Sequence, residues 1–279
     1  MQQRKIPALS IKCSPYQETI AVAHGENFGI AGKGYCSIGQ KTLEFPSVCS
    51  EVAWSETAER LYVFTGKGTL DIFDSQFNKI GQDNMNGEVV CCEWNYLKKD
   101  MFAVLLNEGW LVCNVNGSKE RYPIQGGNEL AWSPRDPFQL AITNLLGFQI
   151  NDIRQPQPIF ALNVDKCMGI DYNKYLNEIV ISTVSKQVLI FDQRQQKIRL
   201  AQPCHDLTIK RVKCSPFHKD RIATCLHDLH TKYWQYSDDF KLIWDKQAHS
   251  EIISGLNFSL FNPYLYDCAW DGTIKRYDV

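Results

Sequence analysis

Carboxylate side chains recur through the 279-residue sequence at intervals of roughly 40 residues, each close to the start of an apolar run. Carboxylates that gather on one face of a protein can bind a basic partner through charge complementarity. The residues in question are Glu51, Glu88, Glu129, Asp165, Asp206 and Glu251. Their use depends on whether the surrounding elements bring them to one side of the molecule.

Patterns for catalysis or for metal and cofactor binding are weak. Cys225, His227, Asp228 and His230 lie close together and could bind zinc, but no CxxC or HxxxH pair accompanies them. The glycine-rich stretch at 29–34 lacks the following helix that a dinucleotide-binding loop needs. No nucleophile, base and orienting group converge on a reacting atom. We therefore expect no catalytic residue, no metal and no cofactor.

Composition narrows the class of protein further. The eleven cysteines form no CxxC pair, and several fall singly inside apolar runs, which is typical of buried thiols in a reducing compartment. The net charge of -1 argues against nucleic-acid or membrane-surface binding, which needs a basic excess. No apolar run approaches the ~18 residues of a membrane-spanning helix, and no secretory leader opens the chain. We expect no direct membrane insertion.

The chain is organised by an internal repeat with two markers. The first is a bulky or apolar residue followed by Ser or Asn, and an aromatic-Asp position follows about 20 residues later, as in Phe73-Asp74, Phe191-Asp192 and Tyr277-Asp278. Because both markers keep the same spacing, chance is a poor explanation. The first marker occurs at Cys13-Ser14, Trp54-Ser55, Trp94-Asn95, Trp132-Ser133, Tyr172-Asn173, Cys214-Ser215 and Phe258-Ser259.

Each unit has the residue pattern of short β-strands. In the second unit, Val48–Ser55, Arg60–Thr65 and Thr69–Asp74 are β-rich runs, with a tight turn at Gly66–Gly68 and a weaker fourth strand beyond. Four strands in about 40 residues predict an all-β, seven-bladed β-propeller of the WD-repeat type.

The whole chain, 1–279, would form this single domain. We expect Arg4–Leu9 to close the ring as the outer strand of the last blade. The predicted blades span 9–46, 47–84, 85–125, 126–165, 166–205, 206–249 and 250–279.

The resemblance to WD repeats implies a hydrogen-bonded network inside each blade. It joins a His before the first strand, an Asp in the turn between the second and third strands, and a Trp on the third. His205, Asp228 and Trp234 match this pattern, and so do His249 and Asp271. In the middle blades Lys67, Glu108, Leu146 and Ser185 stand near the turn instead.

Four further stretches resemble the receptors for the type 2 peroxisomal targeting signal: 28–34, 210–218, 255–260 and 267–275. The resemblance implies a cytosolic receptor that cycles to the peroxisome. Its cargo would be matrix proteins with an N-terminal, basic, helix-forming signal of about nine residues. It also implies a co-receptor and docking proteins at the peroxisomal membrane as partners. The alternative is a general WD-repeat scaffold or assembly subunit.

A basic helical ligand requires an acidic face with apolar pockets. We expect Glu88 and Glu251 to contribute most to that face, with Glu51, Glu129 and Asp165 in the other entry loops. In the turns, Glu108 adds a charge, and Trp110 either forms an exposed anchor or packs between blades. The Lys210–Lys213 charges are expected to be solvated.

Overall fold

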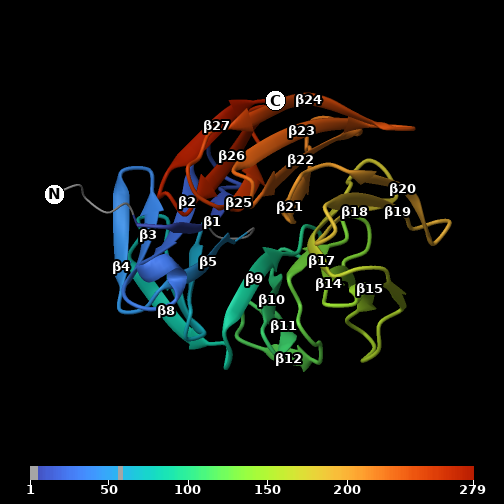
Figure 1. The fold of residues 1–279 in the computed structure, drawn as a ribbon. Coiled ribbons are helices and arrows are strands. Elements are labelled where there is room, and N and C mark those ends of the chain that lie inside the picture. Colours follow the sequence, from blue (N-terminus) through green and yellow to red (C-terminus); the bar gives the residue numbers. More distant parts are fainter. Residues whose placement is uncertain (1–5, 56–58) are drawn as a thin grey trace.

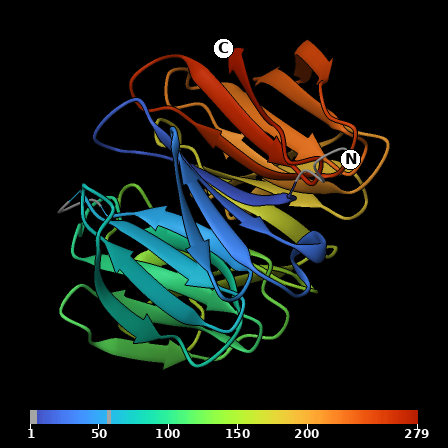
Figure 2. The same ribbon diagram turned by 90° about the vertical axis from the view of Figure 1, so that its left-hand side faces the viewer.

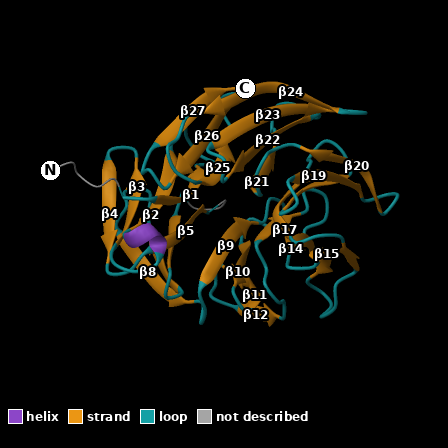
Figure 3. Cartoon of the chain, in the orientation of Figure 1, coloured by secondary structure: helices purple, strands orange, loops and turns teal. Residues whose placement is uncertain are grey.

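The computed structural model describes residues 6–55 and 59–279, and these form an all-β ring of seven antiparallel sheets. Figures 1 and 3 show the ring, whose one short helical turn is the 3-10 helix η1 (Asn27–Gly29). The first three sheets hold β1 (Ala8–Cys13), β2 (Ile20–Gly25), β3 (Gly34–Ile38) and β4 (Lys41–Phe45); β5 (Cys49–Trp54), β6 (Leu61–Thr65), β7 (Thr69–Phe73) and β8 (Lys79–Asn84); and β9 (Val89–Trp94), β10 (Met101–Leu106), β11 (Gly109–Asn114) and β12 (Lys119–Tyr122).

The remaining sheets continue the ring in chain order, so the seven sheets are the blades of a β-propeller. They hold β13 (Glu129–Trp132), β14 (Gln139–Thr143), β15 (Gly147–Asp152) and β16 (Phe160–Asn163); β17 (Cys167–Tyr172), β18 (Glu178–Thr183), β19 (Gln187–Asp192) and β20 (Lys197–Pro203); β21 (Ile209–Cys214), β22 (Arg221–Leu226), β23 (His230–Tyr236) and β24 (Phe240–Gln247); and β25 (Ile253–Phe258), β26 (Tyr264–Ala269) and β27 (Ile274–Asp278). The seven-bladed fold is therefore confirmed, while the exact unit boundaries stay a prediction.

Polarity decreases from the rim of each blade toward its middle. The outer strand β8 is largely exposed, whereas every residue of the second strands β6 and β10 is buried. Each interface between neighbouring blades holds its own apolar cluster, as where Tyr62 and Phe64 of β6 meet Trp94 of β9 and Phe102 of β10. Burial of this apolar surface between sheets holds the ring together.

Ring closure differs from the expected outer strand at residues 4–9. Ala8 and Leu9 belong to β1, the inner strand of the first blade, where Ala8 pairs with His24. Residues 1–5 lie outside the described part, within which the last blade has three strands. The two ends of the ring meet instead through inner strands: Ser254 Oγ donates to the Ala8 carbonyl at 2.6 Å, and Asn257 Oδ1 accepts from the Cys13 N–H at 3.0 Å. Figure 2 shows the first blade between the last and the second.

The inner strands run in one direction around the central channel, so the ring has two distinct faces. We call the side with the loops entering the inner strands, and the turns between second and third strands, the entry face. The opposite side, with the turns that leave the inner strands, is the exit face. The predicted acidic residues belong to loops and strand starts on the entry side.

Candidate functional site

Four of the acidic residues in the entry-face loops and turns have exposed side chains. They are Glu88, Glu108, Asp206 and Glu251. Asn107 Nδ2 donates to the Glu88 carboxylate at 2.5 Å, which links an entry loop of the third blade to its neighbouring turn. Exposed cations lie in the same set of loops and outer strands, at Lys33, Lys67, Arg121 and Lys186. The exposed charge on this side of the ring is therefore mixed, and the third blade contributes two acids.

Asp165 is half-buried and its carboxylate organises its own loop. It accepts hydrogen bonds from the backbone N–H of Lys166 at 2.7 Å and of Ser185 at 2.9 Å. The hydrogen bond from Ser185 lowers the pKa of Asp165, so this group stays ionised over a wide pH range. Asp165 can attract a cation, but its first role in the structure is to join the loop to the Ser185 turn.

Glu51 and Glu129 point into the channel wall rather than outward. Glu51 is 1% exposed and accepts hydrogen bonds from Ser10 Oγ and from the Val52 N–H. Burial raises its pKa. Glu129 is 3% exposed, and its carboxylate lies 3.1 Å from both Arg211 Nη1 and Lys213 Nζ. Neither carboxylate is offered to a ligand on the entry face.

Trp110 also lies inside the protein. It is 1% exposed and stacks on Tyr122 with ring centroids 4.3 Å apart. Its apolar cluster includes Leu130 and Leu140 of the next blade. Of the two alternatives raised by the sequence, the structure therefore shows packing between blades.

The apolar side chains that are exposed on the entry face come from other residues. Leu145 and Leu146, in the turn between β14 and β15, are 50% and 67% exposed, and Val164 is 42% exposed. The Val164 N–H donates to the Leu146 carbonyl at 3.1 Å, so these two residues adjoin. The missed signal was a pair of leucines in the tight turn Asn144–Gly147, where polar residues are usual.

These leucines border a shallow hollow of the third blade. Residues 107–108 and 123–126, including Glu108, line this hollow. Leu145 contacts its edge, because a Cβ built on Gly126 would lie only 2.5 Å from Leu145 Cγ. Acidic and apolar side chains thus adjoin across the third and fourth blades.

The predicted blade network contains the bonds that hold two B–C turns. His205 Nε2 and Thr224 Oγ1 are 2.6 Å apart, and Trp234 Nε1 donates to the same Oγ1 at 2.9 Å. His205 Nδ1 is 3.3 Å from Asp228 Oδ2. Both ring nitrogens of this buried His are therefore occupied, which leaves it without a free position for a ligand.

The seventh blade holds its turn in the same way. His249 Nε2 lies 2.8 Å from Asp267 Oδ1, and its Nδ1 lies 3.4 Å from Asp271. Burial alone would raise the pKa of Asp271, but hydrogen bonds from Thr273 and Ser250 lower it to about 2. Asp271 is thus a structural acceptor. Among residues 6–55 and 59–279 no cluster of His, Cys, Asp or Glu could hold a metal ion.

We expect Asp271→Asn to lower the free energy of unfolding by about 1 kcal/mol at pH 7, because Thr273 and Ser250 lose a charged acceptor. The folded-state pKa is below the usual 3.8, so the contribution is present above that value and lost as the pH falls toward 2. Urea unfolding at pH 7, 5 and 3 measures this difference. Exposed Asp238→Asn is the control, and a difference that grows on acidification would contradict the assignment.

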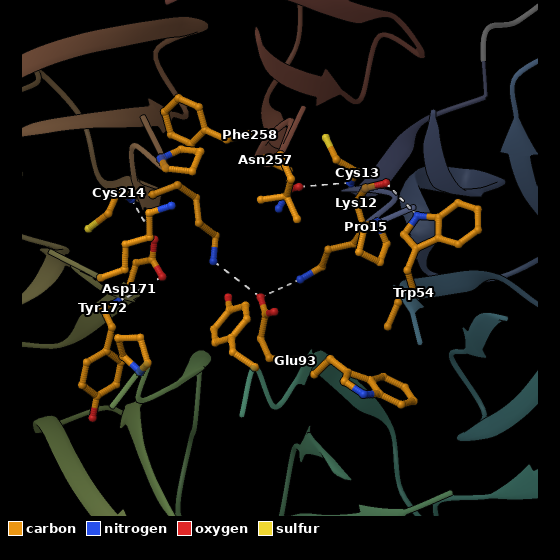
Figure 4. A pocket seen from close by; sticks show the side chains of 18 of the residues that line it. Lys12, Cys13, Pro15, Trp54, Glu93, Asp171, Tyr172, Cys214, Asn257 and Phe258 are labelled. Carbon is orange, nitrogen blue, oxygen red and sulfur yellow. Dashed lines mark hydrogen bonds and ion pairs between the residues drawn. The ribbon is translucent and has the colours of Figure 1, made fainter. Parts of the chain in front are cut away.

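A layer of side chains inside the channel completes the site. Glu93 bridges two lysines across the opening: its Oε1 is 2.6 Å from Lys12 Nζ and 3.5 Å from Lys213 Nζ (Figure 4). Despite the cost of burial, Glu93 and Glu129 raise the pKa of Lys213, which remains charged. The expectation that Lys210–Lys213 is solvated is wrong for Lys213, which is 8% exposed.

The signal for this layer was present in the repeat itself. Each member immediately precedes a bulky marker residue, and side chains at equivalent positions of inner strands face the same channel. The set is Lys12, Ala53, Glu93, Ala131, Asp171, Lys213 and Asn257.

Comparison with known proteins gives the relationship of the chain. A peroxisomal targeting signal 2 receptor of Saccharomyces cerevisiae is 23% identical over 95% of this chain and 95% of its own length. The receptor of the same name from Mus musculus is 41% identical over 75 residues, and that from Homo sapiens is 36% identical over 52 residues. This chain is a relative of the peroxisomal targeting signal 2 receptors.

The relationship to these receptors is uneven along the chain. The aligned segments span 24% of the mouse receptor and 16% of the human receptor, whereas the yeast alignment runs nearly end to end. No protein-family model matches the chain. A chain in the crystal structure of the mitotic checkpoint complex, 17% identical, superposes with a TM-score of 0.79 over 100% of this chain and 94% of its own, which supports the propeller fold. No helix in the described ranges is long and apolar enough to cross a membrane.

Proposed function

We propose that this chain is an import receptor that recognises the type 2 peroxisomal targeting signal of matrix proteins in the cytosol. With a co-receptor and membrane docking proteins it would deliver them to the peroxisome. The observation that carries this proposal is the similarity to the yeast receptor over 95% of both chains. The protein acts by binding rather than by catalysis.

The entry face has the chemistry that a basic amphipathic helix requires. Glu88 and Glu108 are exposed beside the hollow, and Leu145, Leu146 and Val164 are exposed on the next blade. A helix of about nine residues is roughly 13 Å long, which suits a footprint of two blades. Its apolar side would cover the leucines while its basic side chains reach the carboxylates.

Glu251, exposed on the seventh blade, provides a further carboxylate on the entry face. A long Lys or Arg side chain at one end of the helix extends its reach toward this residue. Asp165 adds negative potential from its half-buried position. Glu51, Glu129 and Trp110 would support the face from inside the ring rather than touch the ligand.

Affinity for an isolated signal peptide should be modest, because a short helix loses conformational entropy when it orders on binding. A co-receptor that covers the outer side of the bound helix would bury more surface and slow release. This gives a physical reason for a receptor of two components.

The experiment is a titration of the intact chain with a fluorescein-labelled basic amphipathic peptide, followed by fluorescence anisotropy. We expect saturable binding that weakens as salt rises from 50 to 500 mM (concentrations chosen at about one to three Debye-screening steps), because exposed charges are screened. A peptide with its Arg and His replaced by Glu should not bind. Equal binding of both peptides would contradict the proposal.

The apolar half of the site has its own variant. Leu146→Ser should weaken peptide binding about tenfold, as expected when one exposed apolar anchor is lost. Leu97→Ser on the exit face, at 48% exposure, is the matched control and should leave binding unchanged. If only unrelated assembly proteins bind the chain and neither variant affects the peptide, the alternative of a general scaffold is favoured.

A further inference from the structure

The exit face has a deep cavity on the axis of the ring that the targeting peptide does not use. Its volume is about 500 Å³, within the usual range for ligand sites, and all seven blades contribute to its lining. The floor is the charged bridge Lys12–Glu93–Lys213, and the walls carry the rings of Trp54, Trp94 and others (Figure 4).

Hydrogen-bond donors converge on one side of this floor. Lys213, Asn257 and Lys12 occupy equivalent positions on the sixth, seventh and first blades, which are consecutive around the ring. The Cys13 N–H can only donate, so the oxygen of the Asn257 amide must face it, at 3.0 Å. The amide nitrogen therefore points the other way, into the cavity, as Figure 4 shows.

The charge at the cavity favours an anionic group. Three lysines line it, Lys12, Lys174 and Lys213, against two carboxylates, Glu93 and Asp171. Glu93 is already paired with two of the lysines. Burial raises the pKa of Asp171 to about 6, which reduces its negative charge near neutral pH. An incoming carboxylate would find ammonium and amide N–H groups in one sector.

The rim indicates that the ligand is larger than a small molecule. Exposed apolar side chains follow the inner strands in three separate turns and extend outward beyond the cavity. Such a spread of exposed apolar surface around a pocket is typical of a protein-binding surface. These residues are Tyr96, Leu97, Tyr175, Leu260 and Phe261, each between 45% and 53% exposed.

We propose that the exit face binds an extended segment of a partner protein that carries an acidic side chain flanked by aromatic or leucine residues. The acidic side chain enters the cavity at Lys213, Asn257 and Lys12. The flanking residues pack on the exposed turns around Tyr96 and Leu260. Because this surface lies opposite the entry face, the partner can bind while cargo occupies the other side.

The test selects random 12-residue peptides (a length of about 40 Å when extended) on phage against the intact chain, followed by synthesis of the enriched sequences. We expect enriched peptides to combine Asp or Glu with Trp, Phe, Tyr or Leu within three positions. Absence of enrichment, or enriched peptides without an acidic residue, would overturn the proposal.

Variants at the rim then locate the site. Lys174→Glu and Leu260→Ser change exposed residues, and each should weaken peptide binding about tenfold. Lys186→Glu and Leu207→Ser make the same changes at exposed entry-face residues and should have no effect. Thermal unfolding checks that all four variants are folded. Equal affinity for Lys174→Glu, Leu260→Ser and the parent would contradict an exit-face site, whatever the outcome with the targeting peptide.

Discussion

Replacing Glu93 with leucine is expected to lower the free energy of unfolding by about 3 kcal/mol. This value is at the lower end of the range for a broken buried ion pair, because the cavity admits water. Glu93 is the partner of both Lys12 and Lys213, and without it Lys12 loses its ion pair in a part-buried position. Urea unfolding followed by circular dichroism measures the loss.

A double-mutant cycle separates this charge effect from the change in shape. Lys12→Met in the Glu93→Leu background removes the unpaired ammonium, so the double variant should be more stable than Glu93→Leu alone. If Glu93→Leu unfolds within about 0.5 kcal/mol of the parent, the bridge contributes little and this account of the channel is wrong.

The blades could be predicted from the sequence because their determinants are local. Each marker, such as Trp54-Ser55, ends an inner strand, and runs such as Leu61–Thr65 and Met101–Leu106 combine apolar and β-branched residues that the structure buries completely. Closure of the ring could not be predicted in the same way. It depends on contacts between residues far apart in the chain, such as Ser254 with Ala8.

The misplaced acids have a specific cause. The pairing of β5 with β6 shifts between Cys49 and Glu51, so Ser50 is an extra residue in the inner strand. Such a bulge changes the face toward which the following side chains point, and here Glu51 lies buried beside Ser10 of the next inner strand. The same shift occurs between Ile209 and Arg211. A bulge leaves no clear mark in residue type, so loop and channel acids look alike in the sequence.

Exposed acids were predictable where the turn is simple. Glu88 and Glu251 precede their strands and Glu108 lies in a two-residue turn, so nothing covers them. Trp110 lies one residue inside β11, where alternation directs it between the blades. A shift of a single position therefore decides whether a side chain binds a ligand or builds the core.

Reversing two entry-face charges should have the largest effect on binding. In the Glu88→Lys/Glu251→Lys variant, two carboxylates that attract the basic helix become two ammonium groups that repel it. We expect affinity for the targeting peptide to fall about 100-fold, since each reversal at a charge-paired contact is worth more than a tenfold change. Both residues are exposed, so the fold should persist, as thermal unfolding would show.

The most direct measurement is a peptide titration of three proteins side by side, by anisotropy at low salt. They are the parent, Glu88→Lys/Glu251→Lys, and the control Asp100→Lys/Asp238→Lys, which makes the same charge change at exposed exit-face residues. The account predicts tight binding by the parent and the control and loss of binding only by the entry-face variant. Binding of the peptide by Glu88→Lys/Glu251→Lys with the affinity of the parent would contradict it.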